Sequence, residues 1–268
     1  MNDGIYSEIH YLVEDPVAVL TLDRPSRMNA FTAVTMQEIR HALERSMADH
    51  RVVGTIITGA GSAFCVGLDA TSLAEAAQQP PDTNAIPAEP ALFSYIRDLP
   101  KPVIAAVNGM CAGGGFVLAL MCDLRFAAED AVFTTVFSKR GLVAEHATSW
   151  LLPRLVGTGR ALDLLWSSRR VSGSEAVEMG LAERLAESGC VVQTATAYVK
   201  DLAASTSPES LRITKELVHA HWSTSFETAA HDGHGATMRS LSEPDFAEGV
   251  ASFLERRAPK FKRLGDTS

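Results

Sequence analysis

Two glycine-rich segments, each following a short apolar run, could supply bare backbone N–H groups for chemistry. The first spans residues 108–116, reads Asn-Gly-Met-Cys-Ala-Gly-Gly-Gly-Phe, and follows the apolar run at 102–107. A second apolar run at 117–121 comes next, so the glycines predict a strand-to-helix junction whose N–H groups no side chain covers. A helix start favours negative charge, and this junction can therefore hold an anion or an oxygen that becomes one. Close packing of a helix on a sheet would also explain the glycines.

The second segment spans residues 59–69 and follows the strand-like residues 56–58. It reads Gly-Ala-Gly-Ser-Ala-Phe-Cys-Val-Gly-Leu-Asp and is again rich in small residues. Two such loops can each aim one N–H at a single carbonyl oxygen, which is the geometry of an oxyanion hole. The pair favours catalysis at a carbonyl group over a purely structural role for the glycines.

Length and composition narrow the class of protein. The 268 residues suit one large domain or a domain with an appendage, and 46% hydrophobic with 21% charged residues predicts an ordinary globular protein. The net charge of −8 argues against nucleic-acid binding. No apolar run approaches the roughly 20 residues of a membrane span, and the first residues lack the pattern of a signal peptide. The four cysteines form no Cys-x-x-Cys pair, so we expect free thiols and a cytoplasmic protein.

Other catalytic motifs are missing from the sequence. There is no Gly-x-Ser-x-Gly elbow of a serine hydrolase and no dinucleotide-binding Gly-x-Gly-x-x-Gly. The histidines at 219 and 221 and at 231 and 234 have the composition of metal ligands. Histidines two apart on a helix point in different directions, however, and no cysteine or further acid clusters beside them. We therefore expect no metal.

Hydrophobic periodicity predicts an α/β fold in which parallel strands are buried under helices. Strands are expected at 17–22, 52–58, 102–107, 124–128 and 132–135. A helix is expected through Met36, Ile39 and Leu43, with Thr35 and Glu38 as its capping box, and another at 92–97. The proline-rich residues 77–90 are expected to form a mobile loop or a lid. Beyond about residue 145 the pattern is mostly helical, and Ser207-Pro208 predicts a helix start.

Several motifs resemble those of the enoyl-CoA hydratase/isomerase, or crotonase, superfamily. Residues 22–30 resemble its LNRP…NAL segment, residues 63–69 its AFCAGADL loop, and residues 101–109 with the glycine triplet its KPVIAAVNG core. Residues 121–127 are similar to its CDxRxA motif and residues 253–261 to its FLEKRxPxF end. The matches run from about residue 17 to residue 261 in family order, so the resemblance covers nearly the whole chain.

The resemblance implies a crotonase-type spiral of ββα units over residues 1–204 and a C-terminal α-helical trimerisation region over residues 205–268. It implies self-association to a homotrimer or a hexamer. The ligand would be an acyl-CoA thioester, with coenzyme A as part of the substrate and no further cofactor. By match, the N–H groups of Leu68 and Gly114 form the oxyanion hole, where they would stabilise an enolate more than the ground state.

The resemblance also suggests residues that contact the substrate or its coenzyme A. They are Arg27, Ala63, Val66, Asp69, Val117, Phe137, His146, Trp150, Lys260 and Phe261. Among them, Arg27 matches a basic position near the phosphates, and Lys260 with Phe261 matches residues that reach the coenzyme A of a neighbouring subunit. A solvated helix end would equally explain the basic residues around Lys260. Apolar Val117 and Phe137, with Trp150, suggest a pocket for long or aromatic acyl groups.

The acid that does the chemistry distinguishes the reactions of this superfamily. Its hydratases use two glutamates, and the matching positions here are Val117 and Phe137, which cannot move a proton. Residues 140–146 instead resemble the isomerase segment in which one acid, matching Glu145, moves the proton. We therefore expect an isomerase that shifts an enoyl-CoA double bond by a 1,3-proton transfer. The alternatives are an enoyl-CoA hydratase of unusual arrangement, an acyl-CoA-binding protein without turnover, and a Glu145 that only caps a helix.

Overall fold

The computed structural model describes residues 5–78 and 90–266. Within them the strands form a six-stranded sheet in the order β1-β2-β3-β5-β7-β10 and a four-stranded sheet in the order β4-β6-β8-β9. The strands are β1 (Ile9–Glu14), β2 (Val17–Leu22), β3 (Gly54–Gly59), β4 (Ala63–Cys65), β5 (Val103–Val107), β6 (Met110–Ala112), β7 (Leu124–Ala128), β8 (Val132–Thr134), β9 (Val171–Ser172) and β10 (Arg184–Ala186). Neighbours pair in parallel except β1 with β2 and β8 with β9.

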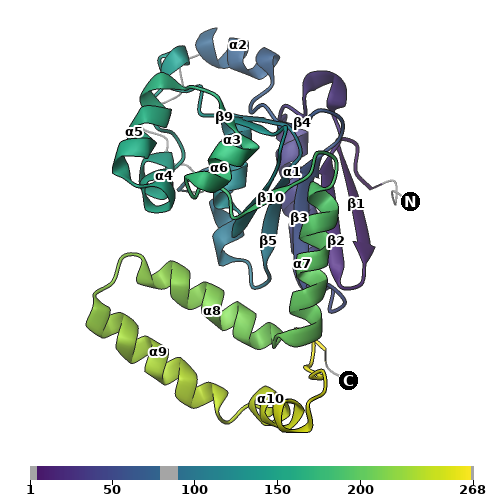
Figure 1. Cartoon of the computed structure of the whole chain (residues 1–268). Helices are drawn as coiled ribbons and strands as arrows, with labels where there is room; N and C mark the ends of the chain where they lie inside the picture. Colours follow the sequence, from purple (N-terminus) through teal and green to yellow (C-terminus); the bar gives the residue numbers. More distant parts are fainter. Residues whose placement is uncertain (1–4, 79–89, 267–268) are drawn as a thin grey trace.

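Helices alternate with the strands as far as β10, and the elements after β10 are all helices (Figure 1). The α-helices are α1 (Ala33–Ala48), α2 (Ala70–Gln78), α3 (Gly114–Met121), α4 (Thr148–Val156), α5 (Thr158–Ser167), α6 (Gly173–Glu178), α7 (Val191–Ser205), α8 (Pro208–His221), α9 (Phe226–Ser240) and α10 (Pro244–Glu255). Short 3₁₀ helices are η1 (Pro25–Arg27), η2 (Ser94–Asp98) and η3 (Ser138–Arg140).

The strands alternate between the two sheets along the chain. β3, β5 and β7 belong to the large sheet, and each is followed within a few residues by β4, β6 or β8 of the small sheet. A helix follows β4 and β6 directly, so the chain winds through repeated ββα turns. The predicted α/β fold, with its spiral of ββα units and its C-terminal helices, is confirmed.

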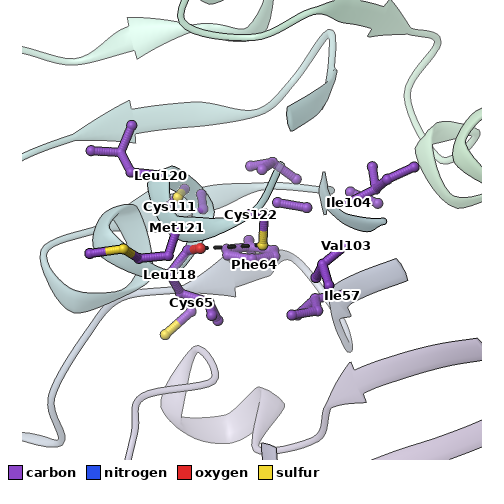
Figure 2. Packing of buried hydrophobic residues seen from close by; sticks show 14 of the residues in the cluster. Ile57, Phe64, Cys65, Val103, Ile104, Cys111, Leu118, Leu120, Met121 and Cys122 are labelled. Carbon is purple, nitrogen blue, oxygen red and sulfur yellow. Dashed lines mark hydrogen bonds between the residues drawn. The ribbon is translucent and has the colours of Figure 1, made fainter. Parts of the chain in front are cut away.

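Burial explains why the middle strands read as continuous apolar runs. All residues of β3 and β5 are buried, as expected for parallel strands covered on both faces. Helix α7 packs against β3, β5 and β7. Helix α3 is buried from Gly115 to Met121, and Figure 2 shows its residues packed among side chains of β3, β4 and β5. A helix that is apolar on all sides belongs in a core, and this one is held there at its glycine-rich start.

The C-terminal helices α8, α9 and α10 lie below the sheets in Figure 1 and extend from the lower end of α7. Ser207 caps α8 and Pro208 is its first residue, as the sequence predicts. Side chains tie α8 to the body of the molecule, since Lys215 Nζ lies 2.8 Å from an oxygen of Asp123.

Some predicted local features differ from the structure. The capping box of α1 joins Thr32 with Thr35, so the predicted pairing of Thr35 with Glu38 is wrong. Glu38 instead accepts hydrogen bonds from the backbone N–H groups of Ser7 and Glu8, the two residues before β1. The helix expected at 92–97 is the 3₁₀ helix η2. Most of the predicted loop at 77–90 falls outside the described residues.

The described helices are all too short or too polar to span a membrane.

Candidate active site

The two glycine-rich loops meet in backbone contact. A methyl group placed on Gly67 would lie 2.7 Å from Gly114 N, and one placed on Gly114 would lie 3.3 Å from Gly67 Cα. On Gly115 it would lie 2.2 Å from Cys65 O, closer than any real carbon–oxygen contact. These positions need glycine because another main chain occupies the place of a side chain.

Gly113 turns the chain into helix α3. It is the N-cap residue with φ 52° and ψ −120°, a conformation that side chains disfavour. Its carbonyl accepts the first helical hydrogen bond, from Val117 N at 3.0 Å. The N–H of Gly114 has no acceptor among the described residues, as is usual for the first turn of a helix.

Phe31 fixes the orientation of the facing loop. Its N–H donates to Gly67 O at 2.7 Å, and its carbonyl accepts from Asp69 N at 2.9 Å, which makes a parallel bridge to Leu68. N–H groups of successive residues in such a bridge point to opposite sides. The N–H of Leu68 therefore points away from Phe31, and within the described part of the chain no group accepts it.

A cavity of about 490 Å³ opens beside these loops, with Leu68 and Ala112 in its wall. Of the predicted site residues, Arg27, Val66, Leu68 and Asp69 line it. These four residues form a wall of the cavity that comes from η1 and from the loop between β4 and α2.

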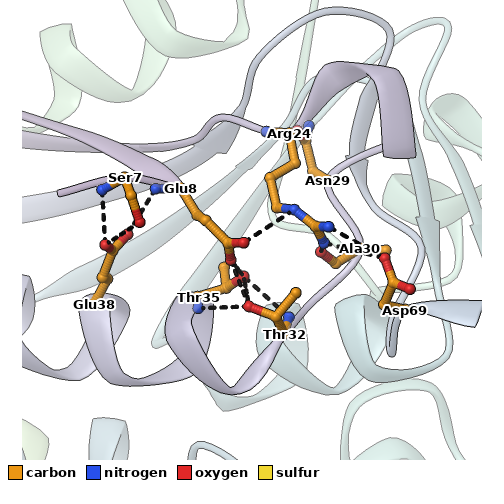
Figure 3. Close-up of polar contacts among 9 residues, drawn as sticks. All are labelled: Ser7, Glu8, Arg24, Asn29, Ala30, Thr32, Thr35, Glu38 and Asp69. Atoms are coloured by element: carbon orange, nitrogen blue, oxygen red, sulfur yellow. Dashed lines mark hydrogen bonds and ion pairs between the residues drawn. The ribbon is translucent and has the colours of Figure 1, made fainter. Parts of the chain in front are cut away.

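Arg24 neutralises the acid in that wall (Figure 3). Its guanidinium lies 3.3 Å from Asp69 Oδ2 and 3.3 Å from Glu8 Oε1, and it donates to Ala30 O. The pKa of Asp69 is held below its ordinary value, first by the N–H of Thr71 and then by Arg24. Asp69 is therefore ionised, and its charge is balanced from behind the cavity.

Asn29 holds the same wall in place. Its Nδ2 donates to Ala63 O at 2.7 Å and to Ala60 O at 2.9 Å, and its Oδ1 accepts from Arg24 N at 2.9 Å. Ala63, which was expected near the coenzyme, is buried in β4 and does not line the cavity.

Glu145 lies in the turn between η3 and α4. His146 and Ala147 follow it with φ 49° and 61°, a left-handed conformation that costs non-glycine residues free energy. The Glu145 side chain is about one third exposed, and its Oε2 lies 3.9 Å from His146 Nε2. His146 Nδ1 accepts from Leu92 N at 3.2 Å. The start of α4 has no side-chain cap, so a capping role for the Glu145 carboxylate is not what the structure has.

The expected apolar pocket residues lie elsewhere. Val117 and Phe137 are buried in the core and do not line the cavity. Trp150 packs against Trp222, the residue after α8, with ring centroids 4.9 Å apart, and the Arg154 guanidinium lies 4.0 Å from the centre of the Trp150 ring. The Trp150 side chain is therefore engaged in these ring contacts.

Lys260 and Phe261 lie on the C-terminal segment, beside α10 and away from the cavity of their own chain. Lys260 N donates to Glu248 Oε1 at 2.6 Å, and Phe261 lies over Gly249. Arg257 binds the same carboxylate, which lowers the pKa of Glu248 to about 2. These contacts fix the position of both residues relative to α10.

The cavity is also lined by basic residues that were not among the site residues predicted from the sequence. Lys139, Arg140 and Arg170 line it, and the Nη1 of Arg140 lies 3.9 Å from where a side chain on Gly113 would begin. The signal available in the sequence was the basic pair Lys139-Arg140 before Gly141, of which Arg140 begins the isomerase-like segment.

The histidines at 219 and 221 make other contacts. His219 lies 3.4 Å from Asp123 and 3.3 Å from Arg97, and His221 lies 3.7 Å from Asp232. In the described part of the chain, no three His, Cys, Asp or Glu side chains gather as a metal site requires.

The spiral of ββα units and the paired glycine loops define the class, and comparison with known proteins gives the family. The family model described as Enoyl-CoA hydratase/isomerase matches residues 13–264, so the chain belongs to the enoyl-CoA hydratase/isomerase family.

Among its relatives is the Escherichia coli protein named 1,2-epoxyphenylacetyl-CoA isomerase, which is 32% identical over 93% of this chain and 96% of its own. A Rhodobacter capsulatus protein named probable enoyl-CoA hydratase is 33% identical over 96% of this chain and 98% of its own. The crystal structure of a probable enoyl-CoA hydratase/isomerase from Mycobacterium abscessus superposes with a TM-score of 0.85 at 36% identity, covering 95% of this chain and 98% of the other.

Proposed function

We propose that this protein is an enoyl-CoA isomerase that moves a carbon–carbon double bond along the acyl group of a coenzyme A thioester. The observation that carries the proposal is the backbone contact between the loops of Gly67 and Gly114, where the N–H groups of Leu68 and Gly114 have no acceptor within residues 5–78 and 90–266. A thioester carbonyl oxygen accepts from both. No cofactor takes part beyond the coenzyme A of the substrate.

The reaction balances with one acid. The Glu145 carboxylate removes a proton from the carbon next to the thioester of a 3-enoyl-CoA, and the electron pair moves onto the thioester oxygen. The N–H groups of Leu68 and Gly114 stabilise this dienolate, and the start of α3 adds a favourable dipole. Protonated Glu145 then returns the proton to the γ-carbon, which leaves the double bond conjugated with the thioester.

Val117 and Phe137 support isomerisation over hydration. Both are buried and apolar, so neither activates a water molecule. The isomerase named among the relatives supports this choice, whereas the relatives named as hydratases favour the second candidate, hydration of a 2-enoyl-CoA. Acyl-CoA binding is common to both.

The test uses the purified protein with a 3-enoyl-CoA and, separately, with a 2-enoyl-CoA. We expect the absorbance of the conjugated thioester to rise with the first substrate, and Glu145→Gln to lower kcat by about 10²- to 10⁴-fold. Full activity of the variant would refute the role of Glu145. Loss of absorbance from the 2-enoyl-CoA would indicate a hydratase, and binding without any change would indicate a protein that does not turn over.

We further propose that the protein assembles as a homotrimer or a hexamer. Phe226 of α9 and Phe253 with Leu254 of α10 are largely exposed, which a second copy would cover. In such an assembly Lys260 and Phe261 reach the coenzyme A bound to a neighbouring subunit.

A further inference from the structure

The cavity beside the glycine loops is lined by several basic side chains. They are Arg27, Lys139, Arg140 and Arg170. Its acid, Asp69, is already paired with Arg24. The cavity therefore presents excess positive charge to whatever enters it.

Three of these cations, Lys139, Arg140 and Arg170, lack acidic partners among the described residues. Lys139 Nζ donates to a main-chain oxygen, Ser168 O, at 3.0 Å, while no described carboxylate pairs with Arg140 or Arg170. Arg169, next along the chain, shows the contrast. It lies 2.7 Å from Asp163 and 2.7 Å from Glu175, on the outside of the cavity. The chain thus pairs the arginine that faces away and leaves its neighbour free for an anion.

The position of Arg140 shows which part of an acyl-CoA it faces. Its Nη1 lies 3.9 Å from the side-chain position of Gly113, the residue before Gly114. Bond geometry places it within about 7 Å of Gly114 N, and so within about 10 Å of an oxygen bound there. The pantetheine arm between the thioester sulfur and the nearest phosphate has about thirteen bonds, the length of about four extended residues or roughly 14 Å. Arg140 therefore lies closer to the thioester oxygen than the nearest phosphate does at the end of an extended arm.

We propose that Lys139, Arg140 and Arg170 bind a carboxylate on the acyl group, so that the substrate is the coenzyme A monothioester of an unsaturated dicarboxylic acid. The inference rests on the proposed function for the place of the thioester. Arg27, which lines the same cavity, serves the coenzyme A side. A guanidinium forms a bidentate pair with a carboxylate, and it therefore binds a carboxylate more tightly than it binds a neutral chain end.

Binding of unreactive saturated thioesters tests this without depending on turnover. Titration calorimetry compares adipyl-CoA with hexanoyl-CoA, which have the same number of carbons and differ by the terminal carboxylate. We expect adipyl-CoA to bind about 10- to 100-fold more tightly to the wild-type protein. In Arg140→Gln this preference should fall to near unity while hexanoyl-CoA binds as before.

Arg27→Gln is the matched control, and it should weaken both thioesters by the same factor. The pantetheine thioesters of the same two acids, which lack the phosphates, should keep the preference in the wild-type protein. Equal affinity of the wild-type protein for both thioesters would overturn the proposal. So would an Arg140→Gln variant that loses both equally, because Arg140 would then bind phosphate. If the protein prefers adipyl-CoA through Arg140 but has no isomerase activity, only the proposed reaction is refuted.

Discussion

Arg24 shows how one side chain sets the charge of the candidate site. It joins Glu8, from the β1 side, to Asp69, which lines the cavity, and it also holds the main chain at Ala30 (Figure 3). Without it, Asp69 would stay ionised because Thr71 N–H still donates to its carboxylate. An unbalanced negative charge would then face an anionic thioester.

We expect Arg24→Met to raise KM for an acyl-CoA about five-fold with little change in kcat, because a partly solvated charge interaction is worth up to about 1 kcal/mol. Steady-state kinetics measure both constants. The double variant Arg24→Met with Asp69→Asn should recover most of the affinity, since it removes the unbalanced charge. If the second substitution restores nothing, Arg24 acts by holding Ala30 rather than by its charge.

At the scale of the elements, Lys101 joins helix α1 to the start of β5. It is buried, and its Nζ donates to Ser46 O at 3.1 Å and to Asp49 O at 2.8 Å, at the end of α1. Burial lowers its pKa to about 8 from an ordinary 10.5. Between these two pH values the unfolded chain carries the proton and the folded protein has lost it.

Stability therefore depends on pH through Lys101. Because the unfolded state binds more protons in this window, the Lys101 contribution to the free energy of unfolding rises from pH 8 to 10.5. Urea unfolding measures the free energy of unfolding of the wild type and of Lys101→Met. From pH 8 to 10.5 this free energy should rise in the wild type relative to the variant by on the order of 2 kcal/mol, after allowance for partial solvation. Burial also raises the pKa of thiols such as Cys65, to about 12. The contribution of these thiols to the pH dependence is the same in both proteins, so it cancels in the difference. A difference that stays constant over this window would contradict the argument.

The elements also show what a sequence can predict. The run at 103–107 and the glycine triplet are local signals, because burial of a parallel strand and contact between main chains constrain each residue directly. The start of α1 was missed because the hydroxyls of Thr32 and Thr35 both suit a cap, and only the packing of Glu38 against β1 decides between them. Arg140 and Arg170 line the same cavity although α4 and α5 separate them in the chain, and no local pattern encodes that arrangement.

For the whole molecule, the C-terminal helices leave apolar side chains uncovered. Phe253 is 81% exposed on α10, and we expect it to lie between copies of the chain. Phe253→Glu should convert a trimer or hexamer into smaller species, measured by light scattering after size exclusion. Trp166 on α5 is 72% exposed and gives a matched control, since Trp166→Glu should leave the mass unchanged. A wild-type protein that elutes as a monomer would refute the expected assembly.

The contact of Gly115 with Cys65 O has a consequence for anyone who redesigns this protein. The loops that carry the Leu68 and Gly114 amides touch main chain to main chain, so neither can be reshaped without displacing the other. Engineering of a new acyl preference should therefore leave these two loops unchanged. It should begin at positions 139, 140 and 170, where exposed side chains can be exchanged without disturbing the backbone.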